Sequence, residues 1–216
     1  MFFTYDAEAT EYLKKRDRQL GDAMHRIGPI HREVDEDLFS GVIRLIVGQQ
    51  ISAAAQATVW KRIADKLGTV SAEAICLCPR DELQGCGITF KKTDYILEFA
   101  GKVQSGSFDL EALRDMPDQE VIRKLSSLSG IGVWTAEMLM IFCMHRPDIV
   151  SYGDLAIHRG MRMLYHHRRI DRSLFEKYAR RYSPYGTVAS LYLWAIAGGA
   201  VPEMRDYAPK KKPKQK

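Results

Sequence analysis

The sequence predicts an all-α protein, and the spacing of its apolar residues is the main reason. Apolar side chains recur at intervals of about three to four residues through most of the chain, as in amphipathic helices. We find no run with the strict alternation, bounded by turn residues, that is typical of a β-strand. Of the 216 residues, 46% are hydrophobic and 27% are charged, which is usual for a globular protein.

Capping residues and helix breakers set the limits of the predicted helices. Asp37 and Ser52 are favourable N-caps, and Pro117 suits a first helical position. The Gly85-Cys86-Gly87 segment predicts a loop, and a short turn starts at Asp109. In chain order, the predicted helices cover residues 7–24, 38–47, 53–67, 71–77, 79–84, 91–103, 117–125, 133–144, 155–163, 172–182 and 185–197.

Composition argues against a membrane or secreted protein. The longest mostly apolar stretch, residues 189–201, is too short to span a bilayer, and the N-terminus has early acids instead of a basic leader. The four cysteines lack zinc-site spacing, so we expect reduced thiols inside a cell. We expect a monomer without membrane contact, cytoplasmic and nucleoid-associated in a bacterium or archaeon, or nuclear in a eukaryote.

The charges are unevenly distributed. The net charge of +5 equals the number of lysines after Pro209, so residues 209–216 predict a basic, disordered tail on a near-neutral body. Residues 158–182 hold eight Arg and Lys residues and only two acidic residues. Residues 1–40 hold six Arg and Lys residues and nine acidic residues. A basic face suits a polyanion, although a solvated helix face would have the same composition.

The most informative segment is the pair of glycines in Leu128-Ser-Gly130-Ile-Gly132, which lies between two predicted helices. Glycine permits backbone angles and close approaches that other residues resist. The free N–H groups at the start of the following helix would then form an anion site, suited to a DNA phosphate. A glycine-capped turn is the simpler interpretation of the two glycines alone.

With its flanking Leu125, Leu128 and Thr135-Ala136, the segment resembles the helix–hairpin–helix of the HhH-GPD DNA glycosylases. In that family a catalytic aspartate lies beyond the helix that follows the hairpin, at the start of the next helix. The matching position here is Asp154, in Ser-Tyr-Gly-Asp-Leu-Ala-Ile-His-Arg. An aspartate that merely caps a helix is the alternative at this position. The resemblance covers about residues 38–199.

Two features that this chain lacks limit the resemblance to one branch of the family. The lyase branch has a lysine two residues after the second hairpin glycine, where this chain has Trp134. Other members carry four late cysteines for an iron–sulfur cluster, but no cysteine follows Cys143. The segments 47–52, 87–92 and 184–194 are similar to the 3-methyladenine DNA glycosylase II branch, although Gly186 replaces an arginine often found there.

The resemblance implies a monofunctional enzyme that hydrolyses the N-glycosidic bond of alkylated purines, such as 3-methyladenine and 7-methylguanine, in double-stranded DNA. The base would be flipped from the stack, with Gln50 as a wedge filling the gap. A polar turn at Gln50 and core packing of the aromatic residues are the alternatives. The implied site residues are catalytic Asp154; Trp134, Trp194, Tyr152 and Tyr185 in the base pocket; and Gln49, Gln50, Ile51, Ser52, Lys92, Gly130, Ile131, Gly132 and Thr135 on DNA.

The resemblance also implies an architecture and an ion. We expect two helical lobes, residues 37–145 with the hairpin at about 117–144, and residues 1–36 with 146–208, and an active-site cleft between them. No cofactor is expected, apart from a sodium or potassium ion on the backbone carbonyls of Ser126, Leu128 and Gly130. His158 and Arg159 can either contact phosphate or face solvent.

Other functions fit parts of the same sequence. A non-catalytic protein could bind DNA or sense damage with the hairpin alone. A glycosylase for another lesion class, including a glycosylase/lyase for oxidised bases, could use the same fold. A helical protein-interaction module would have no affinity for DNA. Asp154 at the family position favours the glycosylase.

Overall fold

The computed structural model describes residues 1–209. The predicted basic tail, from Lys210 onward, lies outside the described residues. Within residues 1–209 the regular structure consists of helices and one isolated β-bridge, between Phe2 and Glu33, which confirms the all-α prediction. None of these helices has both the length and the apolar character that crossing a bilayer requires.

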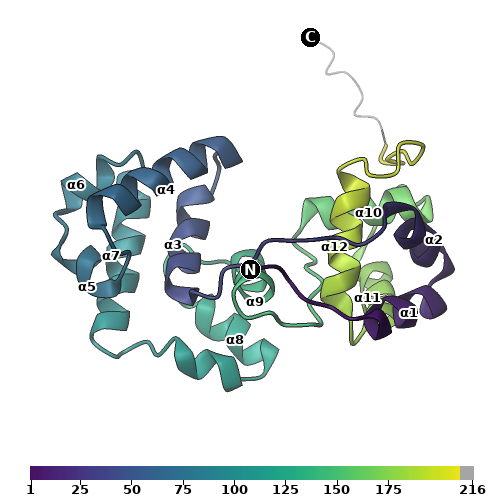
Figure 1. Cartoon of the computed structure of the whole chain (residues 1–216), viewed down its shortest axis with the longest axis horizontal. Helices are drawn as coiled ribbons and strands as arrows, with labels where there is room; N and C mark the ends of the chain where they lie inside the picture. The colour runs from purple at the N-terminus through teal and green to yellow at the C-terminus, as the bar shows by residue number, and fades with distance from the viewer. Residues whose placement is uncertain (210–216) are drawn as a thin grey trace, which may run out of the picture. The chain divides into compact units, whose positions relative to one another are not determined.

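The chain forms two compact units (Figure 1). Unit 1 combines residues 1–34 with the chain from His145 onward, and unit 2 is the continuous segment Asp35–Met144. Each unit contains its own buried apolar core.

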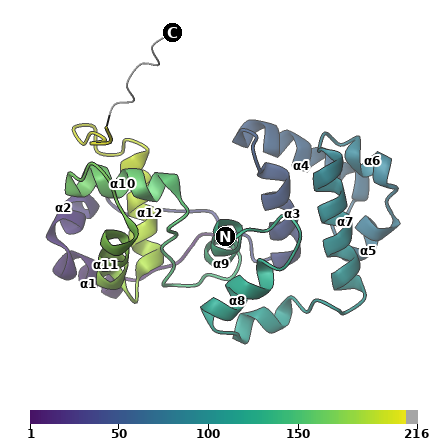
Figure 2. The same cartoon turned by 180° about the vertical axis from the view of Figure 1, so that it is seen from behind.

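Unit 2 is built around α3, whose apolar side chains Ile43, Ile46 and Val47 are fully buried. This helix packs against α4, α7 and α9, and Figure 2 shows it beside α7 from behind. The helices of unit 2 are α3 (Leu38–Gly48), α4 (Ala53–Leu67), α5 (Ala72–Leu77), α6 (Arg80–Gln84), α7 (Phe90–Gln104), the 3₁₀ helix η1 (Glu111–Asp115), α8 (Asp118–Leu125) and α9 (Val133–Phe142).

Unit 1 is built around α12, which is apolar on nearly all sides and is buried from Gly186 to Leu193. Helices from both ends of the chain pack against it, as a helix that is hydrophobic all round requires. The helices of unit 1 are α1 (Ala7–Arg16), α2 (Arg18–Ile27), α10 (Leu155–Tyr165), α11 (Arg172–Tyr182) and α12 (Gly186–Ala197).

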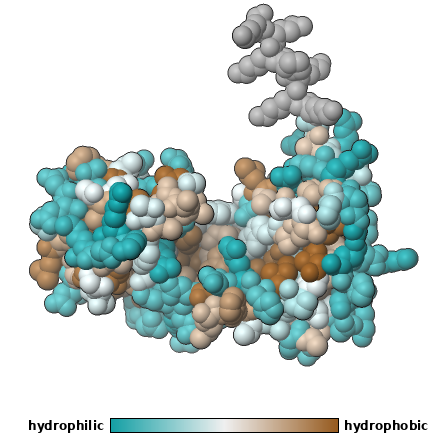
Figure 3. Space-filling view, turned by 45° about the horizontal axis from the view of Figure 1, so that its top comes forward, coloured by the Kyte–Doolittle hydropathy of each residue, from teal (hydrophilic) through white to brown (hydrophobic). Residues whose placement is uncertain are grey.

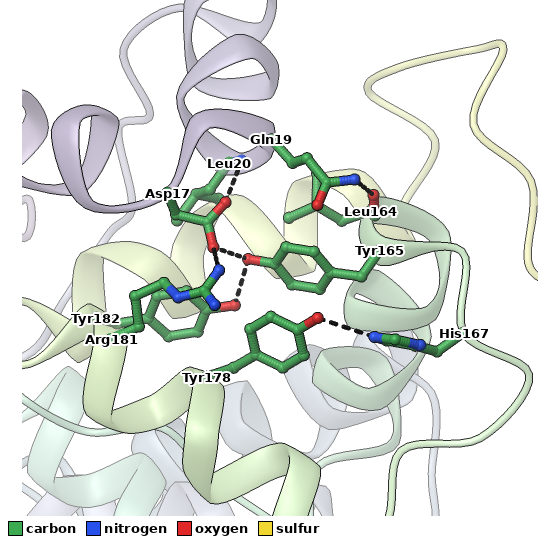
Figure 4. Close-up of polar contacts among 9 residues, drawn as sticks. All are labelled: Asp17, Gln19, Leu20, Leu164, Tyr165, His167, Tyr178, Arg181 and Tyr182. Atoms are coloured by element: carbon green, nitrogen blue, oxygen red, sulfur yellow. Dashed lines mark hydrogen bonds and ion pairs between the residues drawn. The ribbon is translucent and has the colours of Figure 1, made fainter.

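The prediction of a single helix over residues 7–24 is wrong, because Asp17 divides it into α1 and α2. Asp17 has extended backbone angles, and its Oδ1 accepts a hydrogen bond of 3.0 Å from the N–H of Leu20. Its Oδ2 accepts from Tyr165 at 2.8 Å and from Arg181 at 2.7 Å (Figure 4). The side chain is only 3% exposed, so these partners compensate for the burial of its charge.

Candidate functional site

Asp154 is the N-cap of α10. Its Oδ1 accepts hydrogen bonds from the backbone N–H groups of Ala156, at 2.8 Å, and Ile157, at 3.0 Å. The residue is only 7% exposed, yet it carries a carboxylate at the positive end of a helix dipole. These two hydrogen bonds fix the carboxylate in one orientation.

Trp194 lies near the end of α12, the helix against which α10 packs. Its side chain is half-buried. Tyr185, at the start of the same helix, packs edge-on against Tyr12 of α1, and its hydroxyl donates to Glu8 at 3.3 Å. Unit 1 therefore holds Asp154, Trp194 and Tyr185 on two packed helices, with Tyr185 already in contact with α1.

Gly186 is explained by its contact with Asp148. The backbone N–H of Gly186 donates to Oδ1 of Asp148 at 3.0 Å, and the Ser183 hydroxyl donates to Oδ2. A β-carbon at Gly186 would lie 2.7 Å from that Oδ1. A side chain at this position would require Asp148 and Val150 to move. Asp148 accepts instead from the first backbone N–H group of α12.

Tyr152 packs inside a cluster of aromatic side chains. Its ring makes edge-on contacts with His158 and Phe175, each at 5.0 Å between centroids, and Arg172 lies over it at 4.7 Å. Nε2 of His158 donates to the carbonyl oxygen of Tyr152 at 2.8 Å. His158 thus stabilises the turn before Asp154, while Arg159 is exposed.

The hairpin of unit 2 joins α8 to α9 through residues 126–132. Gly130 has a φ of 81°, in the left-handed region that favours glycine, and a β-carbon there would overlap the ring of Tyr95. Gly132 is the N-cap of α9 and has open space around it. No side chain caps α9, whereas Ser52 caps α4 and Thr89 caps α7, so the first turn of α9 is open to an external anion.

The hairpin residues that are predicted to contact DNA or the base differ in their exposed fractions. Ile131 and Thr135 are each only 5% exposed, so only their backbone atoms can reach a phosphate. Trp134, in the first turn of α9, is 42% exposed despite its size. The hairpin therefore presents backbone amides beside one large aromatic ring.

The α3–α4 loop, residues 49–52, lies against the hairpin. The side-chain amide of Gln49 donates to the carbonyl oxygen of Gly130 at 2.8 Å. Gln50 has a φ of 61°, unusual for a non-glycine residue, and both Gln50 and Ile51 are exposed. Ser52 accepts from the N–H of Ala55 at 3.3 Å and so begins α4.

Lys92, predicted to contact DNA, turns toward the same loop. Its Nζ donates to the carbonyl oxygens of Val47, at 2.8 Å, and Gln49, at 2.6 Å. Burial lowers the pKa of this lysine below its usual value.

The carbonyl groups predicted to hold a monovalent ion have neighbours of their own. The carbonyl oxygen of Gly130 accepts from Gln49, and that of Leu128 accepts from the N–H of Ile131 at 3.1 Å. Each carbonyl has a second lone pair. The hydroxyl of Ser126 is buried and has no hydrogen-bond partner among the described residues. Ser126 therefore offers an unpaired oxygen in addition to its predicted carbonyl ligand, and oxygen ligands suit a hard cation. Among the described residues, no group of three or more His, Cys, Asp or Glu residues is arranged to bind a metal.

Two exposed apolar side chains adjoin predicted site residues, one in each unit, and the sequence pattern did not reveal them. Leu155 follows Asp154 directly and is 85% exposed, and Val133 precedes Trp134 and is also exposed. Figure 3 shows brown hydrophobic patches on a face that is otherwise mostly hydrophilic. Helical periodicity alone could not have distinguished Leu155 from a core leucine.

Comparison with known proteins places these features in one family. Residues 43–184 match the model of the HhH-GPD superfamily base excision DNA repair proteins, a range that includes the hairpin and Asp154. The DNA-3-methyladenine glycosylase 1 of Schizosaccharomyces pombe is 28% identical over 182 residues, which cover 82% of this chain and 78% of the relative.

Two solved structures are similar over most of the chain. The DNA-3-methyladenine glycosidase of Bacillus halodurans has a TM-score of 0.85 and 30% identity, covering 96% of this chain and 97% of that one. The 3-methyladenine DNA glycosylase of S. pombe in complex with abasic DNA has a TM-score of 0.76 and 25% identity, covering 88% and 96%.

Proposed function

Because this chain belongs to the HhH-GPD superfamily of base excision DNA repair proteins, we propose that it is a DNA glycosylase for alkylated purines. Its substrates would include 3-methyladenine and 7-methylguanine in duplex DNA, and a monomer would suffice. The observation that carries the proposal is Asp154, whose carboxylate is fixed by two backbone N–H groups within the family region. Relatives named as 3-methyladenine glycosylases support the choice of lesion.

The chemistry requires little more than stabilisation of positive charge. An alkylated purine is a cationic leaving group, so it departs with the bonding electron pair of the N-glycosidic bond as a neutral base. The sugar is left with oxocarbenium character, which a fixed carboxylate stabilises. Asp154 would hold the attacking water or stabilise the cation directly. Water supplies the hydroxyl group at C1′ and loses a proton to solvent.

Base recognition would use the two tryptophans. The enzyme must first rotate the base out of the duplex, and Gln50 with Ile51 would fill the gap. Trp134 and Trp194 would stack on the cationic base, where a cation–π contact contributes about 0.5–2 kcal/mol. Tyr152 and Tyr185 contribute less in this proposal, because both rings already pack against neighbours in unit 1.

DNA binding would centre on the hairpin. The uncapped first turn of α9 suits a phosphate, and Gly132 leaves room for the DNA backbone. The backbone carbonyl groups of Ser126, Leu128 and Gly130 would hold a sodium or potassium ion, whose charge would add to that of the helix dipole. The basic segment from Lys210 onward would add salt-dependent affinity.

We propose hydrolysis without strand cleavage, because Trp134 cannot serve as an amine nucleophile. A lyase reaction would require a Schiff base, and borohydride would then trap a covalent protein–DNA adduct. We expect no adduct from this chain.

The decisive experiment measures free bases released from methylated duplex DNA by the wild type and by Asp154→Asn. Asparagine is also a good N-cap, so the variant should keep α10 intact. Asp171→Asn is a matched control, because Asp171 caps α11 by accepting from the N–H of Leu174. We expect Asp154→Asn to bind DNA without releasing bases and Asp171→Asn to retain activity.

Two other results would contradict the proposed function or the proposed role of Asp154. If the wild type binds DNA but releases no base from a wide panel of lesions, the protein is a non-catalytic DNA-binding protein. If Asp154→Asn releases bases at the wild-type rate, Asp154 is only a helix cap.

A further inference from the structure

Lys92 connects two segments that are distant in the sequence. It lies in the first turn of α7, yet its ammonium group donates to the carbonyl oxygens of Val47 and Gln49, more than forty residues earlier. These carbonyl groups lie at the end of α3, where the last turn of a helix has no backbone donors to satisfy them. A cation at this position also interacts favourably with the negative end of the helix dipole. Lys92 is therefore a cap for α3.

Gln49 is held from two sides. Lys92 binds its carbonyl oxygen, and its side-chain amide donates to the carbonyl oxygen of Gly130 in the hairpin turn. The next residue, Gln50, has left-handed backbone angles and is exposed. Such a conformation is costly for a non-glycine residue and persists only where its surroundings fix it. The two hydrogen bonds of Gln49 hold the backbone next to Gln50 in place.

A third polar side chain strengthens the same corner. The amide of Gln56, in α4, donates to the carbonyl oxygen of Arg44 at 2.7 Å. A β-carbon at Gly48 would lie 2.5 Å from that amide nitrogen, so a side chain there would displace Gln56 from its hydrogen bond. Gln56 thus links α4 to α3, the two helices that the loop joins.

We propose that Lys92 is a positioning residue, which together with Gln49 holds the α3–α4 loop in register with the hairpin. The inference rests on the proposed function, since it assumes that Gln50 and Ile51 enter DNA bound at the hairpin. In this arrangement Lys92 acts through the loop, and it replaces the phosphate contact that the sequence suggested. Two of the three N–H donors of its ammonium group are already used on these carbonyl groups.

Lys91 provides a matched control. It is adjacent in sequence and exposed, and its Nζ lies 5.8 Å from the centre of the Tyr95 ring instead of on a carbonyl group. A general loss of positive charge from the start of α7 would affect both lysines equally. A positioning role would affect Lys92 alone.

The test compares Lys92→Met, Gln49→Leu, their double variant and Lys91→Met. Binding to a duplex with an abasic-site analogue is measured over a range of salt concentrations. A 2-aminopurine opposite the abasic site reports insertion of the loop by its fluorescence, without any catalysis. Single-turnover base release is measured at saturating enzyme, and thermal unfolding identifies any variant that fails to fold.

For Lys92→Met we expect an unchanged salt slope, loss of the 2-aminopurine response, and base release slowed by about tenfold or more, as for a lost charged hydrogen bond. Gln49→Leu should show the same changes as Lys92→Met. The base-release rate of the double variant should fall no further than that of either single variant. Lys91→Met should retain the response and the rate. Gln49→Leu also keeps the test valid if Lys92→Met fails to fold.

Other results overturn the inference. A salt slope lower by about 0.9 in Lys92→Met, with a wild-type rate at saturation, would make Lys92 a phosphate contact. An absent 2-aminopurine response in the wild type would mean that the loop does not enter DNA. If the wild type shows this response but releases no base, the glycosylase function fails while the positioning role stands.

Discussion

Gly160 lies directly against the carbonyl group of Leu193, because a β-carbon at Gly160 would overlap that carbonyl oxygen. The two residues belong to α10 and α12, so these helices approach each other backbone to backbone. Asp154 begins one of the helices, and Trp194 follows Leu193 in the other. The distance between the proposed catalytic carboxylate and one proposed base-stacking ring therefore depends on the absence of a side chain at Gly160.

Gly160→Ala should separate the two helices. The added methyl group meets backbone, which cannot rotate away, so we expect a loss of about 1–3 kcal/mol in the free energy of unfolding, as for other overpacked cores. Base release should fall at the same time. Urea unfolding measures the first effect. Gly101→Ala is the control, because nothing lies within 4 Å of a β-carbon there, and alanine should stabilise α7 by about 0.5–1 kcal/mol. Equal unfolding midpoints for the two variants would contradict this explanation.

The two hairpin glycines should respond differently to alanine. Gly130→Ala combines a left-handed φ with overlap of the Tyr95 ring, so it should lower stability by more than about 1 kcal/mol. Gly132→Ala meets no protein atom within 4 Å, so stability should change little while DNA binding weakens. Thermal unfolding and DNA titration distinguish the two effects. A stable Gly132→Ala variant with unchanged affinity would show that DNA does not approach this glycine.

Tyr165→Phe should destabilise unit 1 without any direct effect on the proposed site. The hydroxyl of Tyr165 donates to Asp17 and accepts from the hydroxyl of Tyr182, which lies 2.7 Å away (Figure 4). Removing it leaves two buried polar groups each with one partner fewer, which costs about 1–3 kcal/mol. Tyr178→Phe is the control, since it removes only a half-buried contact with His167. Urea unfolding of both variants at neutral pH tests the difference, and equal losses would contradict it.

The same tyrosines predict sensitivity to alkaline pH. Burial, followed by the neighbouring Tyr182 and Asp17, raises the pKa of Tyr165 well above its usual range, and burial also raises the pKa of Tyr182. Because these folded-state pKa values exceed the unfolded value of about 10, the stabilisation is complete below pH 10 and is lost as the pH rises further. Absorbance near 295 nm, followed with circular dichroism, should show these phenols ionising only as the protein unfolds.

Ionisation of every tyrosine near pH 10, with circular dichroism unchanged, would contradict this expectation.

The sequence predicted helices where the cap and the apolar period agree. Asp37, Ser52 and Asp154 each cap a helix as expected, because an N-cap depends only on residues within a turn of it. Asp17 was missed because the helical period continues through it. What fixes the break is Tyr165 and Arg181, whose positions depend on tertiary structure.

The sequence could propose residues for the candidate site, but it could not predict their contacts. Motif spacing identified Asp154, the hairpin glycines and Lys92. The direction in which Lys92 points depends on where α7 packs against α3, which periodicity does not reveal. Likewise, the role of His158 became clear only from its hydrogen bond to Tyr152 and its stacking on Phe175.

The order of the two units along the chain affects how the protein can be made. Unit 2 is one uninterrupted stretch, Asp35–Met144, so its whole core is synthesised before the ribosome reaches α10. Unit 1 needs α1 and α2 together with α12, so its first residues must wait for almost the last ones. During synthesis the N-terminal segment, with the apolar faces of α1 and α2, would remain without its partners until α12 emerges. The hairpin would then be assembled well before Asp154 reaches its folded position.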